Sequence, residues 1–368
     1  MNLLFSLRGR PRVAGPLALV VALGLALTVS PACADEWEQT LAAAKKEGTV
    51  SVWGPPGTWA RKTLAEAFNK TYPDIKVDYQ GTTGSRGWPK IERERKAGLY
   101  TVDVHVGGSG TAAGVLYRQK VLEPIGPALL LPEVKDKKNW WDGQHHWSDG
   151  EDKYVFVFII DSSPALAYNT QMVDPKQLKS YMDLLDPKYE GKIVMEDPRG
   201  RGAGSARWLF YVQSMGPEFV KKLAKQLVLT KDVRQGAEWI ASGKYPMGTG
   251  ISDTETRTFA DKGAPIAQIA HLKEGANLTC GWGTANLLTH APHPNAAKVY
   301  LNWLLSKEGQ LAWQTHTSDN SARIDIAKDM VAPEKHVVPG VKYFPNYTAD
   351  SITLRMTVSD KLAKEFLK

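Results

Sequence analysis

Cysteine is scarce in this chain. Only two cysteines, Cys33 and Cys280, occur among 368 residues. We expect Cys33 to leave with a cleaved N-terminal segment, so the mature chain would keep a single thiol. A single thiol cannot form an internal disulfide, which excludes a small secreted domain held together by disulfide bonds.

Long hydrophobic runs are also missing, except at the N-terminus. The arginines of residues 8–12 are followed by the apolar run Val13–Val29 and by Ala32-Cys33-Ala34, a small-x-small cleavage site. This pattern predicts a secretory signal peptide over residues 1–34, and the apolar run is short for a membrane-spanning helix. We therefore expect an exported, periplasmic protein. A lipoprotein anchored at Cys33 is the disfavoured alternative, because Ser30-Pro31-Ala32 is a poor approach to a lipidated cysteine.

The chain has no strong excess of charge of one sign. The formal net charge is +7, and it falls to +4 once the signal peptide leaves, because that segment holds three arginines and no acid. The remaining Lys and Arg residues are scattered beside Asp and Glu, whereas non-specific nucleic-acid binding needs a concentrated basic face. With 43% hydrophobic and 23% charged residues, the composition is that of an ordinary globular protein of one large or two medium domains.

A strand, a glycine-bearing loop and a helix follow one another three times in the first part of the chain. The strands are expected at Thr49–Trp53, Ile75–Tyr79 and Val102–Val106. This alternation predicts the α/β class with a parallel sheet, and ligands of such sheets bind at the carboxyl ends of the strands. A second alternation, over residues 155–270, predicts a second α/β half.

The segment Lys192–Arg207 repeats this pattern with an unusual density of glycine and arginine. An apolar strand, Ile193–Met195, leads through Gly200, Gly202 and Gly204 to Ser205, a candidate N-cap. The first N–H groups of a helix have no internal partner and attract anions, so the turn could receive an anionic or polar solute. The alternative, that the glycines only make a tight turn and the arginines are solvated, remains open.

A family resemblance enters at residues 291–310, APHPNAAKVYLNWLLSKEGQ. This stretch, with Leu166–Thr170 and Ser321–Asp325, resembles the solute-binding proteins of bacterial ABC importers, in the type II periplasmic-binding fold and its ferric-ion and organic-anion branch. The resemblance implies two α/β lobes joined by crossing hinge strands, with the ligand in the cleft between them. It also implies delivery of a small solute to ABC permease subunits in the inner membrane, by a monomer that has no cofactor.

By the same resemblance we place the lobes along the chain. The N-terminal lobe would comprise residues 35–163 and 263–318, and the C-terminal lobe would comprise residues 164–262 and 319–368. Tyr168 would leave the hinge, and the glycine-rich segment would face the first lobe across the cleft.

The solute is expected to be a small organic anion. Iron-binding members of the family use adjacent tyrosines, but this chain has no Tyr-Tyr pair and carries Ser252, Asp253 and Thr254 near that position. His145 and His146 point apart on an extended segment, and the other histidines lack metal-ligand spacing. A bare ferric site is therefore disfavoured, and a ferric complex is the second hypothesis.

Guanidinium, hydroxyl and indole groups are the candidate ligand contacts. Arg86 and Arg199 are the preferred anion clamps, because guanidinium binds carboxylate or phosphonate in a bidentate manner. Arg323 has a competing role as a brace between lobes, and a lone tryptophan is more often core than contact. The expected binding residues are Trp53, Ser85, Arg86, Ser109, Tyr168, Arg199, Ser205, Ser252, Trp282 and Arg323.

A different class of function depends on Cys280. In a cleft enzyme this thiol would need a lowered pKa to act as a nucleophile. A small buried thiol fits the surrounding residues better, and we find no catalytic triad, carboxylate dyad or metal set. The sequence therefore predicts reversible binding without chemistry, and not an enzyme.

Overall fold

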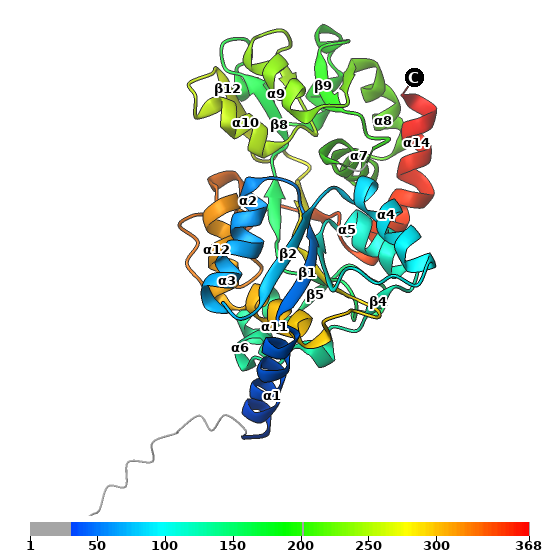
Figure 1. Ribbon diagram of the computed structural model, residues 1–368. Coiled ribbons are helices and arrows are strands. Elements are labelled where there is room, and N and C mark those ends of the chain that lie inside the picture. Colours follow the sequence, from blue (N-terminus) through cyan, green and yellow to red (C-terminus); the bar gives the residue numbers. More distant parts are fainter. Residues whose placement is uncertain (1–30, 201, 368) are drawn as a thin grey trace, which may run out of the picture.

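The computed structural model describes residues 31–200 and 202–367, which form two stacked lobes, each built on its own sheet (Figure 1). The predicted signal peptide lies almost wholly outside the described residues. Within those residues, no helix combines the length and the apolar character needed to cross a bilayer.

The first lobe, in the lower half of Figure 1, contains a seven-stranded sheet in the order β2-β1-β3-β14-β6-β5, with β4 paired to β14. Neighbours β1, β2 and β3 are parallel, as predicted, and β14 runs antiparallel to β3. The strands are β1 (Thr49–Gly54), β2 (Lys76–Gly81), β3 (Val104–Gly107), β4 (Leu122–Glu123), β5 (His146–Trp147), β6 (Phe156–Val157) and β14 (Thr284–Leu288).

Helices cover both faces of the central strands of this sheet, so β1, β3 and β14 are buried along almost their whole length, whereas the edge strand β2 alternates exposed and buried residues. The register pairs Gly54 with Gly81 and Trp53 with His105, so β1, β2 and β3 end at one edge, which faces the second lobe (Figure 1). The helices are α1 (Pro31–Glu47), α2 (Thr58–Arg61), α3 (Ala67–Thr71), α4 (Gly84–Lys96), α5 (Ser109–Thr111), α6 (Pro132–Lys135), α11 (Pro294–Leu305) and α12 (Lys307–Thr317).

The second lobe has a five-stranded sheet in the order β10-β9-β11-β8-β12. Strand β9 is parallel to β10 and β11, whereas β8 runs antiparallel to β11 and β12. The elements are β8 (Leu166–Asn169), β9 (Ile193–Glu196), β10 (Leu227–Thr230), β11 (Met247–Gly248), β12 (Ile266–Ile269), α7 (Ala203–Ser214), α8 (Pro217–Leu223), α9 (Val233–Ala241) and α10 (Asp253–Ala260).

A third, small sheet and a C-terminal helical run connect the lobes. The sheet joins β7 (Asp161–Ser163), β13 (Ala276–Thr279) and β15 (Tyr343–Pro345). The run comprises α13 (Ala349–Leu354), the π-helical turn η11 (Arg355–Ser359) and α14 (Asp360–Phe366). It begins with Ile352 packed in a first-lobe cluster and ends with Leu367 in the second-lobe core, so it spans both lobes (Figure 1).

Two segments lie elsewhere than the predicted lobe boundaries placed them. Strand β12 pairs with β8 in the second sheet, although a boundary at Gly263 assigned it to the first lobe. The segment around Arg323 packs on the first lobe, through a bridge to Trp140, although it was assigned to the second. The position of a strand in the sequence does not show which sheet it joins, because the sheet is determined by the strand with which it pairs. The division into lobes at residue precision remains a proposal.

Candidate functional site

The first lobe presents a rim of turns at the carboxyl ends of β1, β2 and β3. The turn before α4 and the turn before α5 touch, because a Cβ on Gly84 would clash with the Thr111 side chain. Arg86 is exposed in the first turn of α4, and Ser109 is buried at the start of α5. The sheet register thus brings Arg86 and Ser109 to one edge, as the strand-end argument predicted.

A turn between β13 and β14 joins the same rim. Gly281 has φ +51°, and its carbonyl oxygen lies 3.2 Å from the Cβ position of Gly108. This turn exposes Trp282, whose relative exposure of 36% is unusual for tryptophan in this chain. Trp282 therefore stays at the rim as an accessible aromatic surface.

Arg355, from the C-terminal run, also reaches this rim, and it is not among the predicted binding residues. Its Nη1 lies 3.3 Å from the Cβ position of Gly110, and its charge acts on buried Cys280. This contact could not be predicted from residue spacing, because 245 positions separate Gly110 from Arg355. The C-terminal run is packed against both lobes, and that packing places the guanidinium.

The N-terminus of α10 lies against the first lobe, since Asp253 at its start is 3.4 Å from Lys335, and the N-terminus of α7 lies beside it. They lie side by side, because a Cβ on Gly250, just before α10, would meet Gly204 Cα at 2.9 Å. Ser252 caps α10 by accepting a hydrogen bond from the Glu255 N–H at 3.3 Å. Strand, glycine turn and helix follow in the predicted order here, from β9 to α7.

The N-terminus of α7 already holds a carboxylate from the chain itself. Glu196, the last residue of β9, accepts a hydrogen bond from the Gly204 N–H at 2.9 Å. Burial raises the pKa of Glu196, while the N–H groups of Gly204 and Ala203 oppose that shift. The glycine-rich turn is thus built around an anion, as predicted, but that anion is Glu196.

Arg199 and Arg323 are engaged within the protein. Arg199 forms a bidentate pair with Asp197, with two N–O distances of 2.8 Å, and donates to the Leu367 carbonyl at 3.1 Å. Leu367 follows α14, whose end lies far from the first lobe in Figure 1. Arg323 is fully buried in the first lobe, where it binds Asp325 and Glu133. We therefore withdraw both arginines from the proposed anion site.

Three other predicted contacts are packed inside the lobes. Trp53 is 1% exposed and stacks on Trp88 at a centroid distance of 6.3 Å, so it belongs to the first-lobe core. Tyr168 is buried in the second-lobe core, and Ser205 is buried with its hydroxyl donating to the Gly202 carbonyl at 3.1 Å. The side chain of Ser85 lies outside the described residues.

Cys280 is buried at 1% exposure beside Ser109. Burial raises the pKa of its thiol, which keeps the sulfur protonated at neutral pH. A nucleophilic cysteine needs the opposite shift, so the local environment is that of a structural thiol.

Metal-binding side chains do not converge in the part of the chain that the structure describes. No group of three or more His, Cys, Asp or Glu residues there could hold a metal ion. His145 and His146 instead hydrogen-bond to two different carbonyls, those of Val134 and Trp141.

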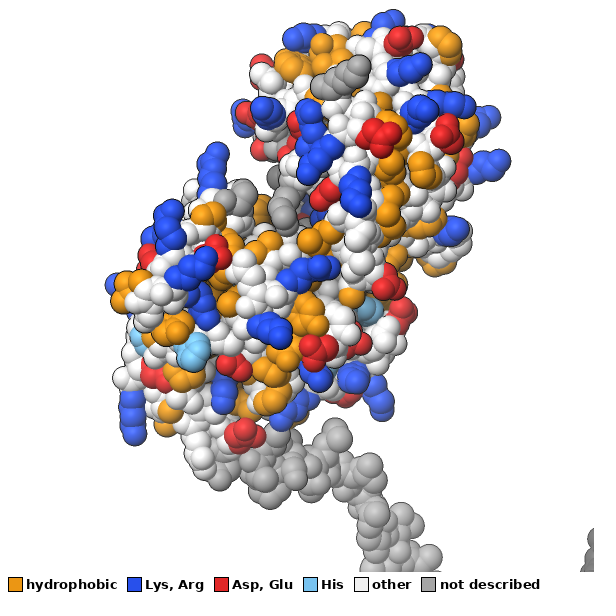
Figure 2. Space-filling view, turned by 90° about the vertical axis from the view of Figure 1, so that its right-hand side faces the viewer, with side chains coloured by type: hydrophobic (Ala, Val, Ile, Leu, Met, Phe, Trp, Pro, Cys, Tyr) orange, Lys and Arg blue, Asp and Glu red, His pale blue; other side chains and the backbone are white. Residues whose placement is uncertain are grey.

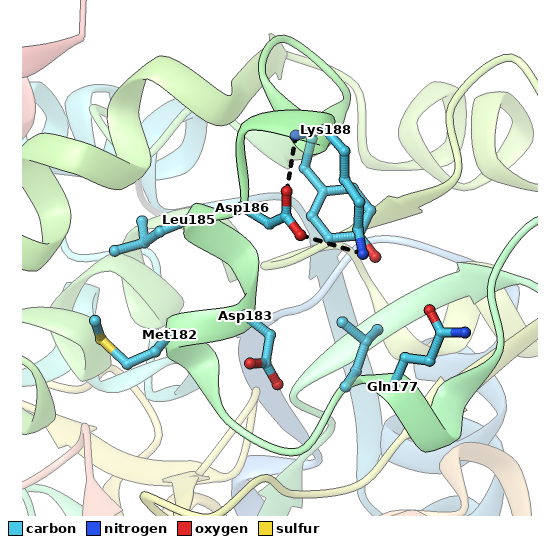
Figure 3. Close-up of a pocket in the computed structure, with 8 residues that line it drawn as sticks. Gln177, Met182, Asp183, Leu185, Asp186 and Lys188 are labelled. Atoms are coloured by element: carbon cyan, nitrogen blue, oxygen red, sulfur yellow. Dashed lines mark hydrogen bonds and ion pairs between the residues drawn. The ribbon is translucent and has the colours of Figure 1, made fainter.

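The surface is hollowed where the two lobes meet (Figure 2). Two further hollows lie on single lobes, away from both rims. One is in the second lobe between Gln177 and Tyr189, where Asp186 pairs with Lys188 at 3.2 Å (Figure 3). The other is in the first lobe, between Arg95 and His290. The space between the lobes, in contrast, is bordered by helix N-termini of both rims, those of α4 and α5 on one side and those of α7 and α10 on the other.

Comparison with known proteins gives a family and a fold. A family model described as bacterial extracellular solute-binding protein matches residues 63–336. An uncharacterized protein of Haemophilus influenzae is 23% identical over 296 residues, covering 79% of this chain and 82% of that protein.

Solved structures share the two-lobed architecture of type II periplasmic-binding proteins. The periplasmic binding protein AfuA from Actinobacillus pleuropneumoniae, bound to fructose-6-phosphate, superposes with a TM-score of 0.64 at 21% identity, covering 87% of this chain and 99% of that one. Iron-bound HitA from Pseudomonas aeruginosa superposes with a TM-score of 0.64 at 18% identity, covering 86% and 99%. At these identities the likeness establishes the fold.

Proposed function

The chain belongs to the family of bacterial extracellular solute-binding proteins, and on that premise we propose that it captures a small organic anion in the interlobe cleft and passes it to an ABC permease. It would do so in the periplasm, as a monomer and without chemical conversion of the solute. The observation that carries the anion preference is the pair of arginines at the first-lobe rim, Arg86 and Arg355.

The two rims would play different parts in binding. On the first lobe, Arg86 and Arg355 supply guanidinium groups, and the start of α4 adds the positive end of a helix. On the second lobe, Glu196 occupies the start of α7 and keeps a second anionic group out of that position. We therefore place the anionic end of the solute against the first lobe and a hydrogen-bonding end near Ser252.

Closure of the lobes would strengthen these contacts. Water is excluded as the cleft closes, and a charge-assisted hydrogen bond is stronger in a drier site. Trp282, exposed in this structure, would cover an apolar or flat part of the solute.

A ferric complex is the second candidate, for which iron-bound HitA and an IdiA structure with iron and citrate are the precedents among similar folds. In this chain an iron ion would have to bring its own anion to the arginines. Ferric citrate therefore belongs in the same binding screen.

The test is a thermal-shift screen with fructose 6-phosphate, citrate, ferric citrate, alkylphosphonates and short carboxylates, followed by calorimetry on each hit. A tight ligand raises the melting temperature by mass action. We expect Arg86→Ala and Arg355→Ala each to weaken binding about tenfold or more, the scale of a lost charge-assisted hydrogen bond.

Arg199→Ala is the matched control, because Arg199 is bound to Asp197 away from the cleft, and its affinity should stay within about twofold of wild type. Unchanged affinity in both rim variants would reject the proposed anion site. If only neutral or cationic compounds bind, the anion preference itself is wrong.

A further inference from the structure

Two ion pairs cross between the lobes at one side of the cleft. The short 3-10 turn η10 (Pro333–Lys335) is carried by the first lobe, because the Ala332 N–H donates to the Ser318 carbonyl at 3.1 Å. From this turn Lys335 reaches Asp253 at 3.4 Å. Its neighbour Glu334 pairs with Arg257 of the same second-lobe helix, α10.

Lys335 is nearly fully buried, at 3% exposure, and Asp253 is only one of its partners. On its own side it pairs with Asp319, which also accepts from the Trp313 indole N–H at 2.8 Å. It also lies 3.5 Å from Asp161, the first residue of strand β7. Burial alone would lower the pKa of Lys335, but these three carboxylates raise it, so the ammonium is charged.

The position of these residues couples them to the proposed site. Asp253 directly follows Ser252, the N-cap residue at the second-lobe rim, and Arg257 lies one helical turn further along α10. A movement of α10 relative to the first lobe must therefore break or rebuild both ion pairs. The solute-binding residues of the first-lobe rim are not part of this contact.

We propose that Lys335, Glu334, Asp253 and Arg257 form a charge bridge that sets the balance between open and closed lobes, and so determines affinity without touching the solute. The bridge is formed in the arrangement that this structure shows, which has a hollow between the lobes (Figure 2), so it would stabilise this arrangement against further closure. Only a difference in free energy between the two arrangements can shift their populations.

The effect of the charge bridge on the lobes can be measured without any solute, so its test does not depend on the proposed function. Spin labels at Thr58→Cys and Lys231→Cys place one probe on the exposed strand-end edge of each lobe, and the native Cys280 is buried. Electron–electron distance measurements then report the fraction of closed molecules.

In Glu334→Gln and Arg257→Gln we expect the short-distance population to rise about two- to fivefold, as fits a partly exposed ion pair. Lys335→Met should give a larger rise if it folds, and the other two variants suffice if it does not. Exchanging the charges, with Arg257→Glu and Glu334→Arg together, should restore the wild-type distribution.

Lys188→Gln is the control, since Lys188 pairs with Asp186 within one lobe and should leave the distances unchanged. An unchanged distribution in Glu334→Gln and Arg257→Gln, or a shift to longer distances, would overturn the proposal. Either result would leave the anion site of the first lobe untouched as a hypothesis.

Discussion

Arginine side chains show most clearly how the same residue type takes different roles in this chain. Arg323 is enclosed by Asp325, Glu133 and the ring of Trp140, and Arg199 is held by Asp197. Arg86 is exposed at the rim. A guanidinium that already has carboxylate partners stabilises the fold, whereas one at a rim is available to a solute.

Arg323→Met tests the structural role of Arg323. The substitution would remove the buried partner of Asp325 and Glu133. Asp325 keeps Lys307 at 3.2 Å and the Glu133 side chain is partly exposed, so the cost should be about 1.5–3 kcal/mol, the scale of lost hydrogen bonds between charged groups. We expect a loss of that size in urea unfolding, with solute affinity per folded molecule unchanged. Arg86→Ala, at an exposed position, should change stability by less than about 0.5 kcal/mol. Equal stability of the two variants would contradict the assignment.

Lys328 should make stability depend on pH in the alkaline range. Burial lowers its pKa from 10.5 to about 8, while Asp161 and Asp325 oppose the shift. Between these values the unfolded chain binds more protons than the folded one, so the free energy of unfolding rises as the pH rises. The slope should approach about 1.4 kcal/mol per pH unit. Chemical unfolding of wild type and Lys328→Met from pH 8 to 10.5 measures it, and the variant should lose this contribution.

At the scale of the element, the β9–α7 unit has the predicted strand, turn and helix, but the group bound at the helix N-terminus is a side chain of the protein itself. Strand, glycine turn and helix appear as predicted, and the helix N-terminus does bind a carboxylate. The carboxylate is Glu196, eight residues before Gly204. The sequence feature that could have indicated this is the position of Glu196, at the end of the strand that precedes the glycine turn.

Substitution of Glu196 separates its capping role from its charge. Glu196→Ala removes an acceptor from the start of α7 and should cost about 0.5–2 kcal/mol, as other cap losses do. Glu196→Gln keeps an oxygen acceptor and should cost less. Because burial raises the pKa of Glu196, its ionisation lowers stability as the pH rises above 4.5, and Glu196→Gln should remove that dependence. Thermal unfolding between pH 4 and 7 compares the three proteins; an identical profile in all of them would contradict the capping role.

At the scale of the whole molecule, the charge bridge at η10 and the helical run α13–η11–α14 connect the two lobes, besides the small sheet of β7, β13 and β15. The helical run is tied to both lobes, since the Gln213 side chain of α7 donates to Ser351 of α13 at 3.0 Å. If the lobes move closer together, the ion pairs of the charge bridge must rearrange, whereas the helical run stays attached to both lobes.

Closure on binding is the prediction at this scale. Small-angle scattering with a saturating hit from the solute screen should give a smaller radius of gyration than the protein alone, because hinge closure brings the two lobes together. Glu334→Gln should show a smaller radius before any solute is added. Lobes that keep the same radius in every condition would argue against a closing cleft.

The sequence by itself determined the α/β class, the parallel strands β1, β2 and β3, the glycine turns at their ends and the family resemblance. These depend on local periodicity and on turn residues, which act within a few positions of the chain. Trp53 lies on a predicted strand and Tyr168 lies on β8, yet both were expected to contact the solute, and the local pattern did not show that their side chains are buried.

Tertiary structure alone decided which polar groups meet. The contacts of Arg355 with the first-lobe rim, of Lys335 with Asp253 and of Arg323 with Glu133 join positions far apart in the sequence. Charge pairing is set by the packing of whole elements, and a residue's type does not specify its partner. For that reason the position of the rim and the presence of Arg86 there could be predicted from the chain, whereas the arrival of Arg355 at the same rim could not.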